Sequence, residues 1–161
     1  MSDPAELYET DFFRWTQEQA TLLRQAPGER INLPIDWRNT ADEIEDMGRR
    51  DLRSVNTLIG VIYEHLLRLE HSPAADPRRV WRHTVRRSRD EIQRILDDSP
   101  SLRSKLSQRW QKEFQIARRN ALDGLEEDGI HASDVPNTPP YSQGQVLDRT
   151  WWPANRHGHT S

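Results

Sequence analysis

The spacing of the apolar side chains is the feature that most limits how this chain can fold. In four successive segments, apolar residues recur every three to four positions, which is the period of a helix that buries one face. The segments are 5–26, 37–70, 78–97 and 100–127. No segment alternates apolar and polar residues as a half-buried strand does, and no unit of about 20–50 residues is repeated. The pattern predicts an all-α fold.

Short polar residues followed by proline mark several of the predicted helix starts. Asp3-Pro4, Asp76-Pro77 and Ser99-Pro100 each place a capping side chain before a proline, which fits the first turn of a helix. Pro27-Gly28 should end the first helix, and Gly129 should end the fourth. We therefore expect a four-helix-type bundle with an extended C-terminal arm packed on it.

The second helix is expected to be long. A helix over residues 37–70 would span about 50 Å at a rise of ~1.5 Å per residue. Gly48 and Gly60 lie in its interior, where glycine costs up to about 1 kcal/mol relative to alanine. The sequence leaves open whether the helix breaks near either glycine or whether another helix crosses closely at Gly60.

Beyond the fourth helix the chain becomes an extended, proline-rich arm, because residues before proline avoid the helical region. Ser142 and Gln145 have the spacing of a capping box for a short turn. We expect a helical bundle domain at 1–128, with an arm at 129–161 docked on it and the last residues, from Asn155, frayed. Three aromatic residues are predicted to anchor the arm, since an exposed Trp-Trp pair is unfavourable: Tyr141, Trp151 and Trp152.

Charge is segregated along the chain, although its net value is only −3. Residues 1–71 carry a net charge of −6, residues 72–122 of +7 and residues 123–161 of −4. This arrangement favours segments that pack against one another, and the alternative is a basic face for nucleic acid. The isoelectric point near 6.1 argues against nucleic acid, whose binding domains usually exceed about 9.

Composition excludes several classes of site. The chain has no cysteine, which excludes disulfides and thiolate zinc sites. No apolar run approaches ~20 residues, so no membrane span is expected. The first residues lack the basic and apolar regions of a secretory signal, so we expect a cytoplasmic protein.

Six stretches of the sequence resemble a known family. They are Leu7–Trp15, Asp36–Gly48, Glu64–Leu69, Trp81–Val85, Asp98–Leu102 and Pro140–Pro153. In this order they are similar to the uncharacterised bacterial family called "domain of unknown function 29". The resemblance implies an all-helical fold and implies no activity. The chain departs from the family in a longer loop at 27–35, in the tail histidines His157 and His159, and in lacking a cysteine before Pro140-Tyr141.

Histidine and glutamate residues on the second and third helices are the candidates for chemistry. Glu64 and His65, with His83 and Glu91, could serve a metal- or acid–base-dependent hydrolase. No histidine has a glutamate three positions before it, so the Glu-x-x-His pattern of di-iron bundles is absent, as is the zincin pattern. The alternative interpretation is that His65 hydrogen-bonds within the bundle and Glu64 is solvated.

The acidic run at 42–46 is interpreted mainly as a solvated helix face that pairs with Arg49 and Arg50 one turn later. Glu43 lies next to the apolar stripe of the same helix. If Glu43 is buried it needs a cation, and Arg89 is the expected partner in a structural polar pair.

The expected function is a non-enzymatic helical module for protein–protein interaction or self-association, with no cofactor and no metal. The sequence has no Gly-x-Ser-x-Gly elbow, P-loop or dinucleotide-binding motif. Two alternatives stay open: the hydrolase described above, and nucleic-acid binding through the Arg-rich third helix. The partner and the oligomeric state are not defined by the sequence.

Overall fold

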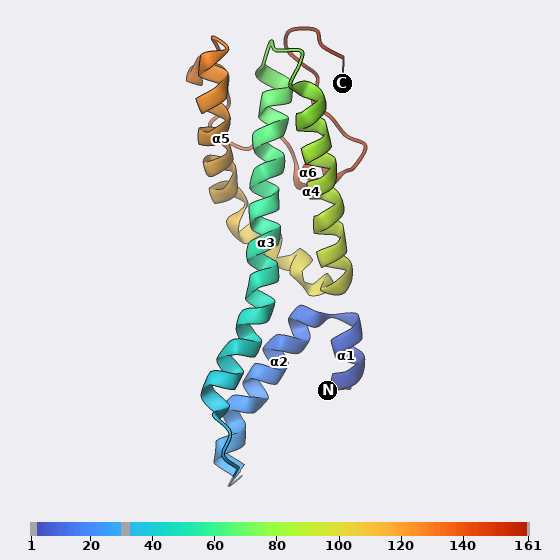
Figure 1. Cartoon of the computed structure of the whole chain (residues 1–161), viewed down its shortest axis with the longest axis vertical. Helices are drawn as coiled ribbons and strands as arrows, with labels where there is room; N and C mark the ends of the chain where they lie inside the picture. The colour runs from blue at the N-terminus through green and yellow to red at the C-terminus, as the bar shows by residue number, and fades with distance from the viewer. Residues whose placement is uncertain (1–2, 30–32, 161) are drawn as a thin grey trace. The chain divides into compact units, whose positions relative to one another are not determined.

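The computed structural model describes residues 3–29 and 33–160, which form helices and connecting segments without a strand. The all-α prediction is therefore confirmed. The α-helices are α1 (Pro4–Thr10), α2 (Phe12–Gln25), α3 (Trp37–His71), α4 (Arg78–Asp98), α5 (Trp110–Glu127) and α6 (Gln143–Leu147), shown in Figure 1. Three segments are 3-10 helices: η1 (Ala26–Glu29), η2 (Pro100–Arg109) and η3 (Ala132–Asp134). None of the helices in the described ranges combines the length and apolar character needed to cross a membrane.

The chain folds into two compact units, and each unit is built from two separate stretches of sequence. Unit 1 comprises residues 1–55 and 94–105, and unit 2 comprises residues 56–93 and 106–161. Helices α3 and α4 therefore contribute residues to both units. The arm shares unit 2 with α5, and the expected domain at 1–128 with an arm docked on it stays a prediction.

The long helix predicted at 37–70 is confirmed as α3, which runs unbroken through both glycines. At Gly48 the hydroxyl of Thr16 lies within the volume that a β-carbon would occupy, and Phe13 Cδ2 would be 3.1 Å from that carbon. At Gly60 the nearest atom would be Glu113 Oε2 at an ordinary 3.6 Å. The close crossing therefore occurs at Gly48, where α2 meets α3, and not at Gly60.

The single helix predicted at 5–26 is wrong, because the chain breaks at Asp11 into α1 and α2. Asp11 has an extended backbone (φ −156°, ψ 85°), and its Oδ1 accepts from the backbone N–H of Arg14 at 3.0 Å. The same carboxylate accepts from the N–H and the hydroxyl of Ser101 at 2.9 and 2.8 Å. The N–H of Phe13 donates to Ser99 Oγ at 3.0 Å. These long-range bonds stabilise the break, since one carboxylate satisfies N–H groups at two helix starts.

The helix predicted at 100–127 is partly wrong, because its first ten residues form the 3-10 helix η2. The N–H of Leu102 bonds to Ser99 O, three residues back, and Ser101 is held by Asp11. These bonds tighten the first turn into 3-10 geometry. The predicted stop at Gly129 is confirmed, with φ +83° and the N–H of Ile130 bonded to Leu125 O five residues back, as in a Schellman motif.

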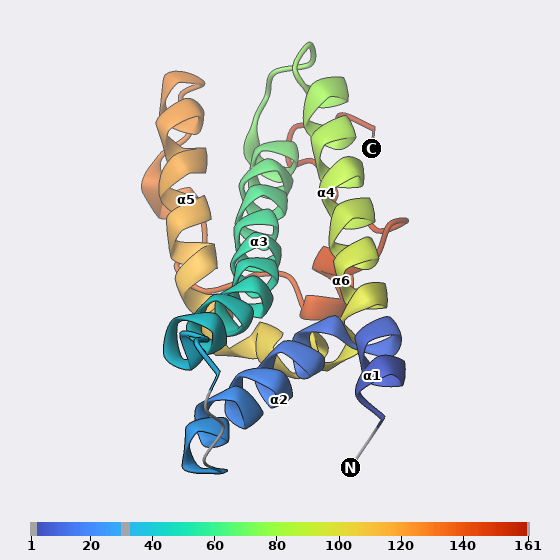
Figure 2. The ribbon, with the colours of Figure 1, turned by 60° about the horizontal axis from the view of Figure 1, so that its bottom comes forward.

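The core of unit 2 surrounds Tyr63 on α3, which the apolar spacing did not single out. Within this unit α3 lies between α4 and α5 (Figure 2). The Tyr63 ring packs edge-on against Trp110 and Phe114 of α5, with centroids 5.6 and 5.2 Å away, and stacks on Tyr141 of the arm at 5.8 Å. Its hydroxyl accepts from Trp110 Nε1 at 2.9 Å and donates to Tyr141 O at 2.8 Å. Burial raises the pKa of Tyr63 to about 12.

Substituting the two glycines of α3 should have opposite effects on stability. Gly48→Ala forces a methyl group onto the buried Thr16 hydroxyl, which is fixed by its bond to Phe13 O, and should lower the free energy of unfolding by about 1–2 kcal/mol. Gly60→Ala meets only ordinary contacts and should raise it by up to about 1 kcal/mol through helix propensity. Urea denaturation measures both values. Equal effects of the two substitutions would contradict the difference in crossing distance.

Candidate functional site

The structure gives separate environments to the four predicted catalytic candidates. Glu64 forms an ion pair with Arg68 at 2.8 Å, and His65 Nδ1 donates to Val61 O at 2.8 Å, both within α3. His83 is exposed on α4, and Glu91 lies about 12 Å further along the same helix at ~1.5 Å per residue. Across residues 3–29 and 33–160 no three histidine, aspartate or glutamate residues are grouped to hold a metal ion. The geometry therefore gives no support to the hydrolase alternative.

The predicted polar pair of Glu43 and Arg89 is wrong. The Glu43 side chain is 78% exposed and lies 3.7 Å from Arg50, so it does not need a buried cation. Arg89 is the buried member, only 3% exposed, but its partners are backbone carbonyl groups. The physical reason is that Glu43 occupies the solvent side of α3 next to the stripe, whereas Arg89 faces the arm.

Arg89 holds the arm through three carbonyl groups. Its Nε donates to Val146 O at 2.8 Å, its Nη1 to Trp151 O at 3.0 Å and its Nη2 to Gln145 O at 3.2 Å. Its guanidinium also lies over the Trp152 ring, 5.0 Å from the centroid. Burial lowers the pKa of Arg89 to about 10, so it is still charged at neutral pH. The carbonyls of Gln145 and Val146, which lack partners within the short helix α6, thus accept hydrogen bonds from a buried charge.

The aromatic residues proposed as arm anchors all lie in unit 2. Tyr141 is buried, and its hydroxyl donates a short hydrogen bond to Glu70. Burial and the Glu70 carboxylate raise the pKa of this hydroxyl, so it stays protonated. Trp151 packs on the Tyr141 ring with centroids 5.2 Å apart. The predicted capping box of Ser142 and Gln145 is confirmed at the start of α6.

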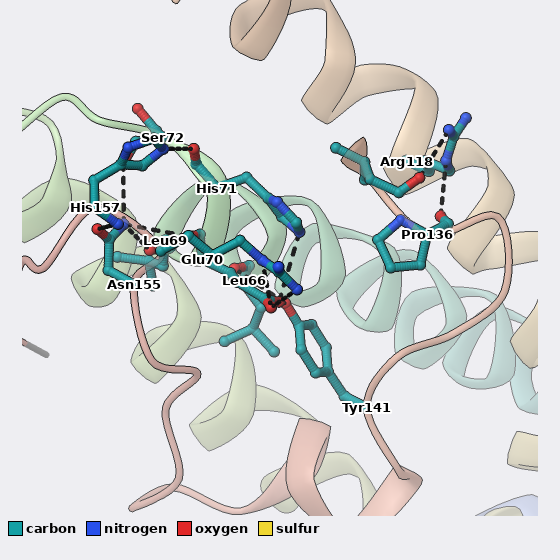
Figure 3. Close-up of polar contacts among 12 residues, drawn as sticks. Leu66, Leu69, Glu70, His71, Ser72, Arg118, Pro136, Tyr141, Asn155 and His157 are labelled. Carbon is teal, nitrogen blue, oxygen red and sulfur yellow. Dashed lines mark hydrogen bonds and ion pairs between the residues drawn. The ribbon is translucent and has the colours of Figure 1, made fainter. Parts of the chain in front are cut away.

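The end of the chain caps α3, so the expectation that residues from Asn155 on are frayed is wrong for the described residues up to 160. Asn155 Nδ2 donates to the carbonyls of Leu69 at 2.8 Å and Ser72 at 3.0 Å (Figure 3). His157 Nε2 donates to His71 O at 2.9 Å, as Figure 3 also shows. The last carbonyls of a helix have no partner within the helix, and here the tail supplies the donors. Ser161 lies outside the described residues.

His71 is a buried titratable group beside this cap. Its side chain is 1% exposed, and its Nε2 lies 3.7 Å from Glu70 Oε2 without forming a hydrogen bond to the described residues. Burial lowers the pKa of His71, and the Glu70 carboxylate opposes this only in part. The native ring is therefore neutral at neutral pH, and a proton on it would be an incompletely compensated buried charge.

A second feature, on unit 1, is a cluster of aromatic rings at the surface. Tyr8 of α1 lies edge-on to Phe12 and Trp15 of α2, with centroids 5.9 and 5.0 Å away, and the latter two rings stack at 5.9 Å. Tyr8 is 49% exposed, Phe12 and Trp15 are half-buried, and Leu22 on the same stripe of α2 is 42% exposed. We call these four residues the aromatic surface.

Replacing Arg89 should destabilise unit 2 far more than replacing a neighbouring exposed arginine. Arg89→Met removes three charge-assisted hydrogen bonds and leaves the buried Val146 carbonyl without its donor, so the free energy of unfolding should fall by about 3 kcal/mol. The exposed Arg87→Met should change it by less than about 0.5 kcal/mol. Urea denaturation followed by tryptophan fluorescence tests this, and a similar small effect of both variants would show that Arg89 does not hold the arm.

The protein should lose stability as the pH falls below about 6.5, and His71 should account for part of the loss. The unfolded histidine takes up a proton near pH 6.5, whereas the native His71 does so only at lower pH. The unfolded state is therefore favoured by falling pH until the native pKa is reached. Melting temperatures between pH 7.5 and 5 should fall less steeply for His71→Gln than for the wild type. His83→Gln, at an exposed site, should keep the wild-type slope; a wild-type slope in His71→Gln would refute the role of His71.

Comparisons with known proteins agree with the helical fold. A search of curated proteins found no match. The chain is similar to a crystal structure of an alpha-helical protein of unknown function from Rhodospirillum rubrum ATCC 11170, with 28% identity, a TM-score of 0.74 and coverage of 89% of this chain and 90% of that one. The family model described as "Domain of unknown function DUF29" matches residues 7–152, which include the aromatic surface, Arg89 and most of the arm. The chain therefore belongs to the DUF29 family.

Proposed function

We propose that the protein is a helical interaction module that binds a basic amphipathic helix of a partner protein through the aromatic surface of unit 1. The observation that carries the proposal is the contact of three aromatic rings with one another at the surface, where a chain with no use for them would bury them or replace them. Single exposed apolar residues are ordinary, but a contiguous cluster marks an interaction site.

The residue types of the aromatic surface suit protein recognition. Tyrosine, tryptophan and phenylalanine are enriched at the centres of protein interfaces, because each buries a large area with few side-chain rotations to restrict. The mutual ring contacts hold Tyr8, Phe12 and Trp15 in fixed positions before a partner binds. Preorganised rings reduce the entropy cost of association.

A groove that Leu22 shares with its neighbours on α2 offers room for an apolar side chain of the partner. It has a volume of about 380 Å³ and is lined by α2 residues that include Thr21, Leu22 and Gln25. Its position next to Leu22 places it along the same helix as Trp15. A partner helix with apolar residues at three- and four-residue spacing could contact the rings and the groove together.

The charge around the aromatic surface favours a basic partner. Helix α1 carries Glu6 and Glu9, both exposed, and no basic residue, and on α2 the exposed Arg14 is paired with Glu18 at 2.9 Å. A second copy of the same surface would bring these acids together, whereas lysine or arginine residues flanking an apolar helix face would pair with them. The acidic rim is the reason to prefer a different, basic partner to self-association.

Site-specific photo-crosslinking at Tyr8 tests the proposal in the cells that make the protein. A photoreactive phenylalanine analogue at position 8 should give one dominant adduct, and the peptide attached to it should belong to a basic amphipathic helix. The same analogue at Val80, which is 65% exposed in unit 2, is the control and should not give this adduct. A dominant adduct with a second copy of the chain, or none above the control, would contradict the proposed partner.

The captured segment then provides an affinity test. As a synthetic peptide it should bind the purified protein, and Tyr8→Ser should weaken binding at least about 30-fold, as expected for an aromatic hot spot. Val80→Ser should leave the affinity unchanged. Circular dichroism spectra of the variants establish that they are folded. Equal affinity of wild type and Tyr8→Ser would remove the aromatic surface from the interaction.

A further inference from the structure

We propose that the first turns of α4 and the end of the chain form a pocket that binds the phosphate groups of a small phosphorylated molecule. The pocket has a volume of about 390 Å³ and lies in unit 2, away from the residues used in the proposed function. Its charged lining consists of four arginines, Arg78, Arg79, Arg82 and Arg86, and it also includes His159 and Thr160.

The spacing of the arginines concentrates positive charge in the pocket. Arg78, Arg82 and Arg86 follow one another at intervals of four residues, which places them on one face of α4, and Arg79 joins them from the first turn. The lining residues include no carboxylate. Like charges at this spacing repel, so an anion that bridges them relieves repulsion as well as forming hydrogen bonds.

Protein contacts hold these side chains in place. Arg78 is 7% exposed, and its Nη1 donates to Leu69 O at 2.9 Å. The guanidinium groups of Arg82 and Arg86 lie over the Trp152 ring, 5.2 and 5.3 Å from its centroid. The indole therefore supports two arginines at the pocket without neutralising their charge.

The hydrogen-bond donors of the pocket are not fully used within the protein. The Nε of Arg82 is buried and has no acceptor among the described residues. Burial, and then the charge of Arg82, lowers the pKa of Arg78, which is the direction expected where cations lie together without a counter-ion. A bound anion would offer an acceptor to Arg82 and would raise the pKa of Arg78.

The tail completes the pocket because it caps α3. Asn155 fixes the tail against the end of α3, and His159 Nε2 donates to Pro73 O at 2.7 Å. These bonds bring His159 and Thr160 to the basic turns of α4, where the threonine hydroxyl adds a neutral donor. His159, one of the two tail histidines by which the sequence departs from the family, thus takes part in the pocket.

The chemistry of the lining favours phosphate over other anions. Guanidinium groups match the paired oxygens of phosphate, and four of them exceed what one carboxylate can accept. The pocket can accommodate two linked phosphates. Extended nucleic acid is the less favoured ligand, because the arginines of the pocket span only about two turns of α4 and the whole chain has an isoelectric point near 6.1.

Titration calorimetry with pyrophosphate at about 150 mM NaCl tests the proposal. The full-length protein should bind one pyrophosphate. The double variant Arg79→Gln/Arg86→Gln, at two exposed positions, should weaken binding at least about tenfold, because two charge-assisted donors are lost. The control Arg87→Gln/Arg103→Gln removes the same charge from exposed positions outside the pocket and should change the affinity less than about twofold.

Each other outcome overturns the proposal. No binding of pyrophosphate by the wild type would exclude the pocket as a phosphate site. Equal weakening by the two double variants would show that only the general charge of the protein attracts the anion. Binding of a single-stranded oligonucleotide in the absence of pyrophosphate binding, with a steep dependence on salt, would assign the arginines to nucleic acid instead. Melting curves of both double variants establish that they are folded.

Discussion

The hydrogen bonds from Arg89 to the arm are the interaction on which unit 2 depends. A buried guanidinium needs acceptors, and the last carbonyls of α6 need donors. The hydrogen bonds between them therefore offset the cost of removing both groups from water. Fixing α6 also fixes Tyr141. The Tyr141 ring stacks on Tyr63, and its backbone carbonyl accepts a hydrogen bond from the Tyr63 hydroxyl. The aromatic core of the unit is therefore complete only when the arm is in place.

Local patterns predicted the long elements well and the short ones poorly. Helices α3 and α4 match the ranges expected from the sequence because their apolar stripes are continuous and their ends carry clear signals. The break at Asp11 was missed because it is stabilised by Ser101, which lies ninety residues away, and a helical stripe runs across the break undisturbed. The Asp11 side chain, three residues before Arg14, was the only local signal of a new helix start.

The polar residues were predicted least well, because their role depends on whether the side chain is buried, and the sequence pattern alone does not determine this. Arg89 was predicted only as the partner of a buried Glu43, and its actual acceptors were not foreseen, since backbone carbonyls have no signature in the sequence. The same holds for Asn155 at the end of α3. The two surfaces proposed to bind ligands differ in chemistry and belong to different units: aromatic rings with an acidic rim in one, and supported arginines in the other.

The interleaving of the two units has a consequence for synthesis on the ribosome. Unit 1 needs residues 94–105, including the serine that holds Asp11, and unit 2 needs the arm up to the residues that cap α3. During translation the apolar faces of residues 1–55 therefore stay partly uncovered until residues 94–105 have been synthesised. Neither unit corresponds to a contiguous fragment, so neither can complete its core before its second segment has been synthesised.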